Sequence, residues 1–158
     1  MNWKTFGSFA GKFMIAHTVT YLVVGAAAYQ FLTKPFYEGP EAIFAVFMRS
    51  PAEPESWKHV MTWFIPAQLL RGLLIAAVFI PFYDLLCSWS WRKRWLTIAS
   101  FYMVIGCWAC AVAAPGTIEG LVYNKPVFTP YVHLKVQPEL LFQGGLMAAW
   151  VARWMKRR

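Results

Sequence analysis

Charged residues are scarce in this sequence, and the scarcity limits its class. Only 14% of its 158 residues are charged, whereas 59% are hydrophobic. A soluble domain typically has about 25% charged residues, so the composition argues against a soluble globular protein. The 15 basic residues outnumber the seven acidic ones, but they fall in the gaps between apolar runs. We therefore expect membrane lipids as partners and no nucleic acid.

Cysteine and histidine are also few. Three Cys are too few, and an odd number, for a disulfide framework. Cys107 and Cys110 form a C-x-x-C pattern inside an apolar stretch, where thiolates are disfavoured, so we favour close helix packing over a redox role. We expect no metal and no cofactor, because the three His show no ligand spacing: His17, His59 and His133.

Long apolar runs dominate what remains. A helix needs about 20 mostly apolar residues to cross the hydrocarbon layer, and an isolated apolar segment must be helical there to satisfy its own backbone hydrogen bonds. We predict an all-α integral membrane protein, a compact bundle of four transmembrane helices in a single domain, 1–158. The expected spans are about 13–32, 60–86, 95–114 and 138–155, of which the fourth is the shortest.

The first span also resembles a secretory signal peptide. Lys4 and Lys12 precede its apolar core, and three alanines at 26–28 are typical of a cleavage site. The apolar run continues without a polar break to Leu32, however, so we favour a retained span.

Positive charge predicts the orientation of the spans, because Lys and Arg are retained on the cytoplasmic side. With four spans, both chain ends share one side with the tight turn at 90–94. That side has nine basic residues, and the longer loops opposite have five. Six of the seven acidic residues also lie in those opposite loops or at their ends. We predict a multi-pass protein of the cell membrane, the inner membrane in a two-membrane envelope, with both termini cytoplasmic.

The two outer loops differ in composition. In the first, residues 41–49 form an apolar segment with Glu at its start and Arg at its end, which matches a helix dipole. Two interpretations remain open: a short interfacial helix lying in the membrane surface, or a cap packed on the outer ends of the bundle. The second loop, 115–137, is rich in Pro, which argues against a long helix. Its alternating residues 132–136 favour a short strand.

Arg71 is the one full charge well inside a predicted span, about 16 Å from its outer end at 1.5 Å per residue. A charge at the bilayer centre costs about 2.5–3.5 kcal/mol, so such residues pair or face a cavity. We predict an outward-facing polar pocket that binds a ligand. An ion pair between Arg71 and one Glu that only fixes helix register is the alternative. The expected ligand-binding residues are Gln68, Arg71, Glu119, Tyr123, Glu139 and Gln143.

A second polar pair is expected near the inner side. His17 lies about one turn inside the first span, and Asp84 lies near the inner end of the second, so the two could form a hydrogen bond. We favour the simpler alternative, in which Asp84 lies among the lipid headgroups, where an acid costs little, and His17 bonds a backbone carbonyl.

Three classes of function fit these residues. The leading hypothesis is the binding or transport of a small anionic or amphiphilic ligand that Arg71 receives. An enzyme acting on a lipid-borne substrate would use Glu119 or Glu139 as the general base and Arg71 to stabilise negative charge. An accessory subunit, or a homo-oligomer, would use the small-residue faces at Gly144 and Gly145 to meet a partner.

Overall fold

The protein is all-helical. The computed structural model describes residues 3–40, 42–124, 128 and 130–155, and these contain no β-strand. Glu41, Lys125 and residues 156–158, which the helix and charge predictions used, lie outside the described residues. The elements are α1 Trp3–Ala28, the π-helix η1 Tyr29–Thr33, α2 Lys34–Tyr37, the 3-10 turn η2 Ile43–Val46, α3 Pro54–Phe79, the 3-10 turn η3 Ile80–Phe82, α4 Tyr83–Ser88, α5 Trp91–Ser100, the π-helix η4 Phe101–Trp108, α6 Ile118–Tyr123 and α7 Pro130–Trp154.

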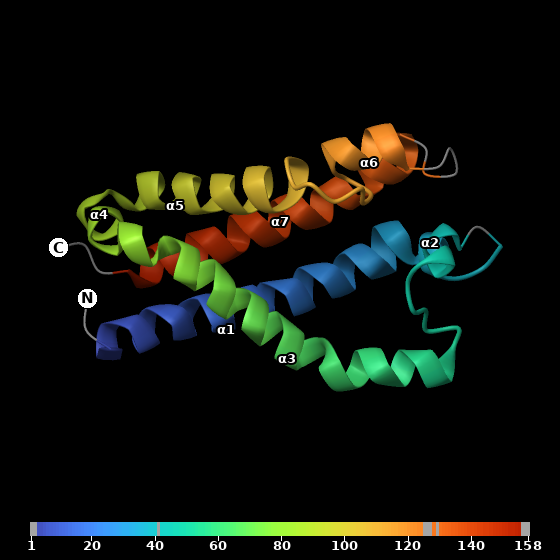
Figure 1. Cartoon of the computed structure of the whole chain (residues 1–158), viewed down its shortest axis with the longest axis horizontal. Helices are drawn as coiled ribbons and strands as arrows, with labels where there is room; N and C mark the ends of the chain where they lie inside the picture. Colours follow the sequence, from blue (N-terminus) through green and yellow to red (C-terminus); the bar gives the residue numbers. More distant parts are fainter. Residues whose placement is uncertain (1–2, 41, 125–127, 129, 156–158) are drawn as a thin grey trace.

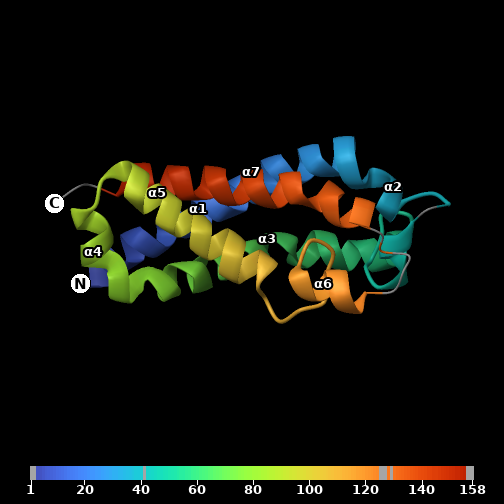
Figure 2. The same cartoon turned by 90° about the horizontal axis from the view of Figure 1, so that it is seen from above.

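Four long helical units run alongside one another (Figures 1 and 2). They are α1–η1–α2, α3–η3–α4, α5–η4 and α7. Helix α1 packs against α3 and α7, and α5 packs against α7. The start of α1, the end of α7 and α4 lie at one end of the molecule, whereas α2 and α6 lie at the other.

Two of these units are long and apolar enough to cross a membrane. They are Trp3–Tyr37 and Pro54–Ser88, of 35 residues each. Both extend beyond the predicted spans, because polar residues at their ends continue the helix. The helical class is therefore confirmed, together with two helices that have the dimensions of membrane spans.

The third and fourth predicted spans have different boundaries. Helix α5 begins at Trp91, where the Ser90 side chain accepts a hydrogen bond from the backbone N–H of Lys93. The π-helix η4 then ends at Trp108, before the predicted end at 114. Helix α7 begins at Pro130, a residue type suited to the first helical turn, and not at 138.

The strand expected at 132–136 is wrong, because these residues belong to α7. Val132 is buried and Val136 partly buried against Phe36 and Phe44, and they share one face because they are four residues apart in a helix. The apolar–polar alternation therefore coincides with a helical stripe.

The helix expected at 41–49 is reduced to the single 3-10 turn η2. Phe44 in this turn is buried against Phe36 at the end of α1–η1–α2 and against Val132 of α7. The segment is thus a cap packed on the helix ends, and its outer side leaves Val46 and Phe47 exposed.

Small residues let the helices approach closely. A Cβ atom at Gly72 of α3 would lie 2.7 Å from the Cα atom of Met14 in α1, and one at Gly144 of α7 would lie 2.6 Å from the ring of Tyr102. The second small face of α7 has a different use. Trp95 and Trp91 of α5 donate their indole N–H groups to the carbonyls of Gly145 and Ala149 at 3.0 and 3.4 Å.

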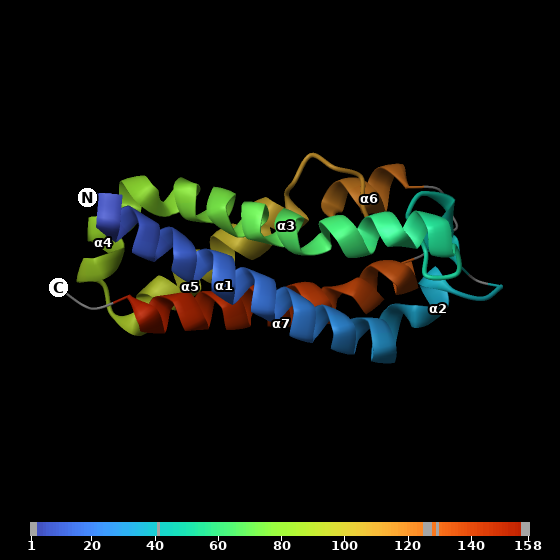
Figure 3. The ribbon, with the colours of Figure 1, turned by 90° about the horizontal axis from the view of Figure 1, so that it is seen from below.

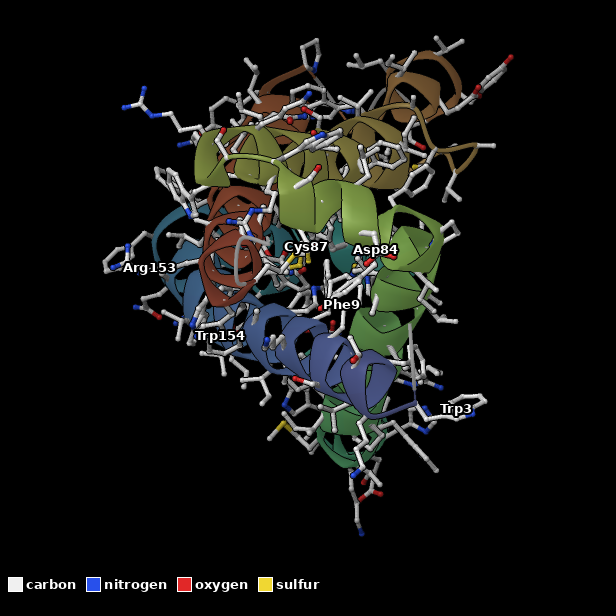
Figure 4. All side chains as sticks on the ribbon, turned by 90° about the vertical axis from the view of Figure 1, so that its left-hand side faces the viewer. Trp3, Phe9, Asp84, Cys87, Arg153 and Trp154 are labelled. Carbon is white, nitrogen blue, oxygen red and sulfur yellow. The ribbon has the colours of Figure 1, made fainter. Side chains whose placement is uncertain are left out.

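Two basic side chains meet the C-terminal end of α7. Lys12 donates to the carbonyl of Trp154 at 3.1 Å, and buried Arg94 donates to that of Met155. Figure 4 views this end of the molecule. Cations stabilise the unpaired carbonyls at a helix C-terminus, so these residues hold the end of α7 against α1 and α5.

Candidate functional site

Four buried polar side chains lie near the middles of the four long units. They are His17 of α1, Gln68 of α3, Tyr102 of η4 and Gln143 of α7, with exposed fractions of 0%, 9%, 6% and 2%. Figure 3 shows α1 crossing from the side of α3 to the side of α7. Burying polar groups is costly unless they are hydrogen-bonded, so their partners decide what the cluster does.

One hydrogen bond joins α1 to α3 within the cluster. The His17 ring nitrogen Nε2 lies 3.1 Å from the amide oxygen Oε1 of Gln68. Because an amide oxygen only accepts, Nε2 carries the hydrogen in this pair, and Nδ1 of a neutral His17 is left as an acceptor. The His17 and Tyr102 rings also face one another, with centroids 6.0 Å apart.

Three buried atoms of the central cluster have no hydrogen-bond partner within the described part of the chain. They are Nδ1 of His17, the hydroxyl of Tyr102 and Nε2 of Gln143. An unsatisfied buried donor or acceptor costs about 1–3 kcal/mol, and most buried polar atoms in proteins are paired. Four further buried polar atoms of the described residues are likewise without a partner, on Thr18, Arg94, Asn124 and His133, and the three atoms of the central cluster lie on three different helices.

Arg71 lies at the edge of the cluster. Its guanidinium carbon is 5.8 Å from the centroid of the Tyr102 ring, a cation–π distance. The side chain is exposed, so Arg71 faces the cluster with one side and the surroundings of the bundle with the other.

Glu139 flanks the same cluster from α7. Its carboxylate oxygen Oε1 lies over Gly25 of α1, where an added Cβ would be 3.5 Å away. The carboxylate is partly buried. Gln143 follows one turn later on the same face. Arg71 and Glu139 thus flank the cluster from α3 and from α7.

Two of the predicted ligand-binding residues lie outside the central cluster. Glu119 and Tyr123 both belong to α6, at the end of the molecule opposite the start of α1. Tyr123 is 72% exposed, and Glu119 lies in the first turn of α6, where a negative charge suits the helix N-terminus.

The segment Pro115–Gly120 is explained by packing. Gly116 has a φ of +93°, and a Cβ there would lie 2.7 Å from Val136. The Thr117 hydroxyl caps α6 by accepting from the N–H of Gly120, and a Cβ at Gly120 would lie 2.0 Å from the carbonyl oxygen of Ala114. These requirements account for the residue types at both glycines and at Thr117.

Helix α7 holds this segment in place. His133 accepts a hydrogen bond from the Gly116 N–H at its Nδ1 atom, and Gln137 donates to the Gly116 carbonyl, both at 3.0 Å. Gln137 also accepts from the indole of Trp108 at 2.9 Å.

Burial lowers the pKa of His133 below 6.5. Because its pKa is lower in the folded state, His133 binds a proton more tightly in the unfolded chain. The free energy of unfolding therefore has its full value, as far as His133 is concerned, above about pH 6.5, and it falls as the pH drops below that value.

His17 and Asp84 do not form the pair considered from the sequence. His17 bonds Gln68 through Nε2, while its Nδ1 has no partner among the described residues. Asp84 lies in the first turn of α4, at the end of the molecule that Figure 4 faces. The simpler alternative is also wrong for His17, because its partner is a side chain and not a backbone carbonyl.

Two further features of the described residues are the state of the cysteines and the grouping of possible metal ligands. Cys87, Cys107 and Cys110 are free thiols, and Cys110 donates to the carbonyl of Cys107 at 3.0 Å. Within the described residues, no group of three His, Cys, Asp or Glu side chains could hold a metal ion.

Sequence reasoning missed two members of the site. Tyr21, whose ring centroid lies 6.1 Å from that of His17, and Tyr102 lie in apolar stretches, and neither was predicted as a ligand-binding residue. A usable signal was present for Tyr102, because it lies well inside the third predicted span, where a phenol needs a hydrogen-bond partner.

The chain matches no family model, no curated protein and no solved structure in the comparisons made with known proteins. Its function is therefore argued from its own geometry.

Proposed function

We propose that this chain is a four-span membrane protein that binds a small anionic, amphiphilic ligand in the central cluster. The observation that carries the proposal is the set of three buried polar atoms, on His17, Tyr102 and Gln143, that have no hydrogen-bond partner among the described residues. Arg71, beside Tyr102, supplies the positive charge.

The distribution of apolar residues supports membrane embedding. Each long unit exposes large aliphatic or aromatic side chains along its length, whereas the polar cluster is inside. In a soluble protein the buried side chains are mostly the apolar ones. Only 28% and 22% of the most apolar windows in the first two units are buried, which argues against their being core helices of a soluble domain. One exposed example from each unit is Val23 at 64%, Leu74 at 59%, Ile105 at 62% and Phe142 at 64%.

The unpartnered atoms restrict the chemistry of the ligand. Nε2 of Gln143 can only donate, so it needs an acceptor on the ligand. Nδ1 of His17 needs an N–H or O–H group, because Nε2 already carries the hydrogen. The ligand also needs an anionic group, which would lie beside the Arg71 guanidinium. A hydroxylated amphiphile with a carboxylate or phosphate satisfies all three requirements.

The accessory-subunit hypothesis keeps its docking surface in this arrangement. Trp95 and Trp91 donate to the carbonyls of Gly145 and Ala149, but a Cβ added at Gly145 would have no atom within 4 Å, so this small-residue face is open. An enzyme remains the second hypothesis, with Glu139 as the carboxylate nearest the cluster. A Glu139→Gln variant that keeps the ligand but loses turnover would favour it.

The four-span topology predicts a definite labelling pattern. In a background with all three Cys changed to Ser, a membrane-impermeant maleimide applied to intact cells should label Ser56→Cys and Tyr123→Cys. It should label Lys93→Cys only after the membrane is permeabilised. If α5–η4 and α7 do not cross, Tyr123→Cys will be protected like Lys93→Cys, and a two-span topology replaces ours.

Arg71→Leu tests the ligand hypothesis. A hydrogen bond to a charged group contributes about 1.5–3 kcal/mol, so ligand retained through purification should fall at least about tenfold. Mass spectrometry of molecules extracted from the purified protein measures this. Arg49→Leu, an equal charge change at an exposed site away from the cluster, should retain the ligand. Equal loss in both variants would contradict a specific role for Arg71.

A further inference from the structure

A second polar site lies at the opposite end of the bundle from α6. A groove of about 290 Å³ opens between the start of α1, the start of α4 and the end of α7. We call it the inner groove. Its lining residues are Lys4, Thr5, Ser8, Phe9, Lys12, Tyr83 and Met155.

The polar groups of the inner groove are mainly hydrogen-bond donors. Lys4 and Lys12 contribute ammonium groups with three donors each and no acceptor, and Ser8 contributes a hydroxyl. Lys12 is held in place, because its Nζ atom donates to the Trp154 carbonyl at 3.1 Å, which leaves two N–H groups free. Phe9 and Met155, exposed by only 2% and 4%, form an apolar floor.

The surroundings of the groove are basic. Arg94 is buried against the Met155 carbonyl, and Arg92 and Arg153 lie in helices that begin or end at the same end of the molecule. Among the described residues, the acid at this end of the molecule is Asp84, which follows Tyr83, is not among the lining residues and is engaged in an interaction of its own. The electrostatic potential at the groove is therefore positive and attracts an anion.

Trp3 places this end at the level of lipid headgroups. Its side chain is 87% exposed beside the groove residue Lys4, and Figure 4 shows it projecting away from the bundle. Exposed Trp residues concentrate at the membrane–water interface, and basic pockets between helices on the cytoplasmic side bind anionic headgroups.

We propose that the inner groove binds the phosphate group of an anionic phospholipid in the cytoplasmic leaflet. Lys4, Lys12 and Ser8 would donate to the phosphate oxygens, and the acyl chains would lie along the exposed apolar side of α1. The proposal rests on the membrane embedding and orientation proposed above, and it is independent of any ligand in the central cluster.

Native mass spectrometry of the purified full chain in detergent tests this site, with phosphatidylglycerol as the probe. A single basic residue near a membrane surface contributes about fivefold to anionic lipid binding, so Lys4→Gln should weaken the 1:1 complex about fivefold. Lys4 is preferred to Lys12, because Lys12 also holds the end of α7. The matched control is Lys93→Gln, the same change at the same end but above the Trp89 ring, 4.2 Å from its centroid.

The comparison probes separate lipid binding from binding of a free anion. Phosphatidylcholine should bind more weakly than phosphatidylglycerol, and millimolar inorganic phosphate should not displace the lipid. Displacement by inorganic phosphate would overturn the lipid in favour of a free anion. Equal losses in Lys4→Gln and Lys93→Gln, or equal binding of both lipids, would overturn the site. Failure of the labelling pattern described above would instead overturn the orientation.

Discussion

Changing Gln143 to Leu should remove the ligand while leaving the protein at least as stable. The Nε2 atom of Gln143 is buried and has no hydrogen-bond partner among the described residues. Removing an unsatisfied buried amide avoids its cost of about 1–3 kcal/mol, so the ligand-free variant should unfold at the same or a higher denaturant concentration. Loss of the amide donor should lower retained ligand roughly tenfold, which mass spectrometry of the extracted protein would measure.

Gln137 provides the matched control on the same helix. Both ends of its amide are hydrogen-bonded, since Nε2 donates to the Gly116 carbonyl and Oε1 accepts from the Trp108 indole. Gln137→Leu should therefore lower the free energy of unfolding by about 1–3 kcal/mol and keep the ligand. If Gln143→Leu destabilises the protein as much as Gln137→Leu does, the central cluster has a structural role and the binding proposal fails.

Gly72→Ala should be among the most destabilising single methyl additions in the protein. The added Cβ would lie 2.7 Å from Cα and 3.1 Å from N of Met14, which are backbone atoms that cannot rotate away. Helices α1 and α3 must separate to accommodate it. Overpacking of this kind costs about 1–3 kcal/mol, measurable as a lower midpoint in thermal unfolding followed by tryptophan fluorescence.

The same variant should also disturb the central cluster. Gln68 lies one turn before Gly72 on α3, and its 3.1 Å hydrogen bond with His17 joins the two helices that Gly72→Ala would push apart. The control is Gly11→Ala in α1, where nothing lies within 4 Å of the new Cβ and where Ala is up to about 1 kcal/mol better than Gly in a helix interior. A Gly72→Ala protein as stable as the Gly11→Ala protein would show that α1 and α3 do not pack as described.

The central cluster and the inner groove lie at different depths in the bundle. The first lies at the middles of the helices and has unpartnered atoms of both donor and acceptor type. The second lies at the end that holds Trp3 and Trp154, and its polar atoms are donors on Lys and hydroxyl side chains. A ligand with mixed hydrogen-bonding groups suits the first, and a phosphate suits the second.

The sequence by itself determined the helical class and where polar residues interrupt the apolar stretches. Apolar runs of this length have no stable alternative to helix when water is absent, so the structure has helices wherever long apolar runs occur. Gln68, Arg71, Glu139 and Gln143 were identified for the same reason, because a polar residue in such a run is conspicuous. The ends of the helices were less accurate, because capping by Ser90 and the position of Pro130 decided them.

Only the tertiary structure decided which polar groups meet. His17 bonds Gln68 and not Asp84, and Arg71 lies beside the ring of Tyr102, because the crossing of α1 with α3 at Gly72 sets which side chains share a level. Contacts between helices depend on rotation and distance, which the apolar pattern of one segment does not encode.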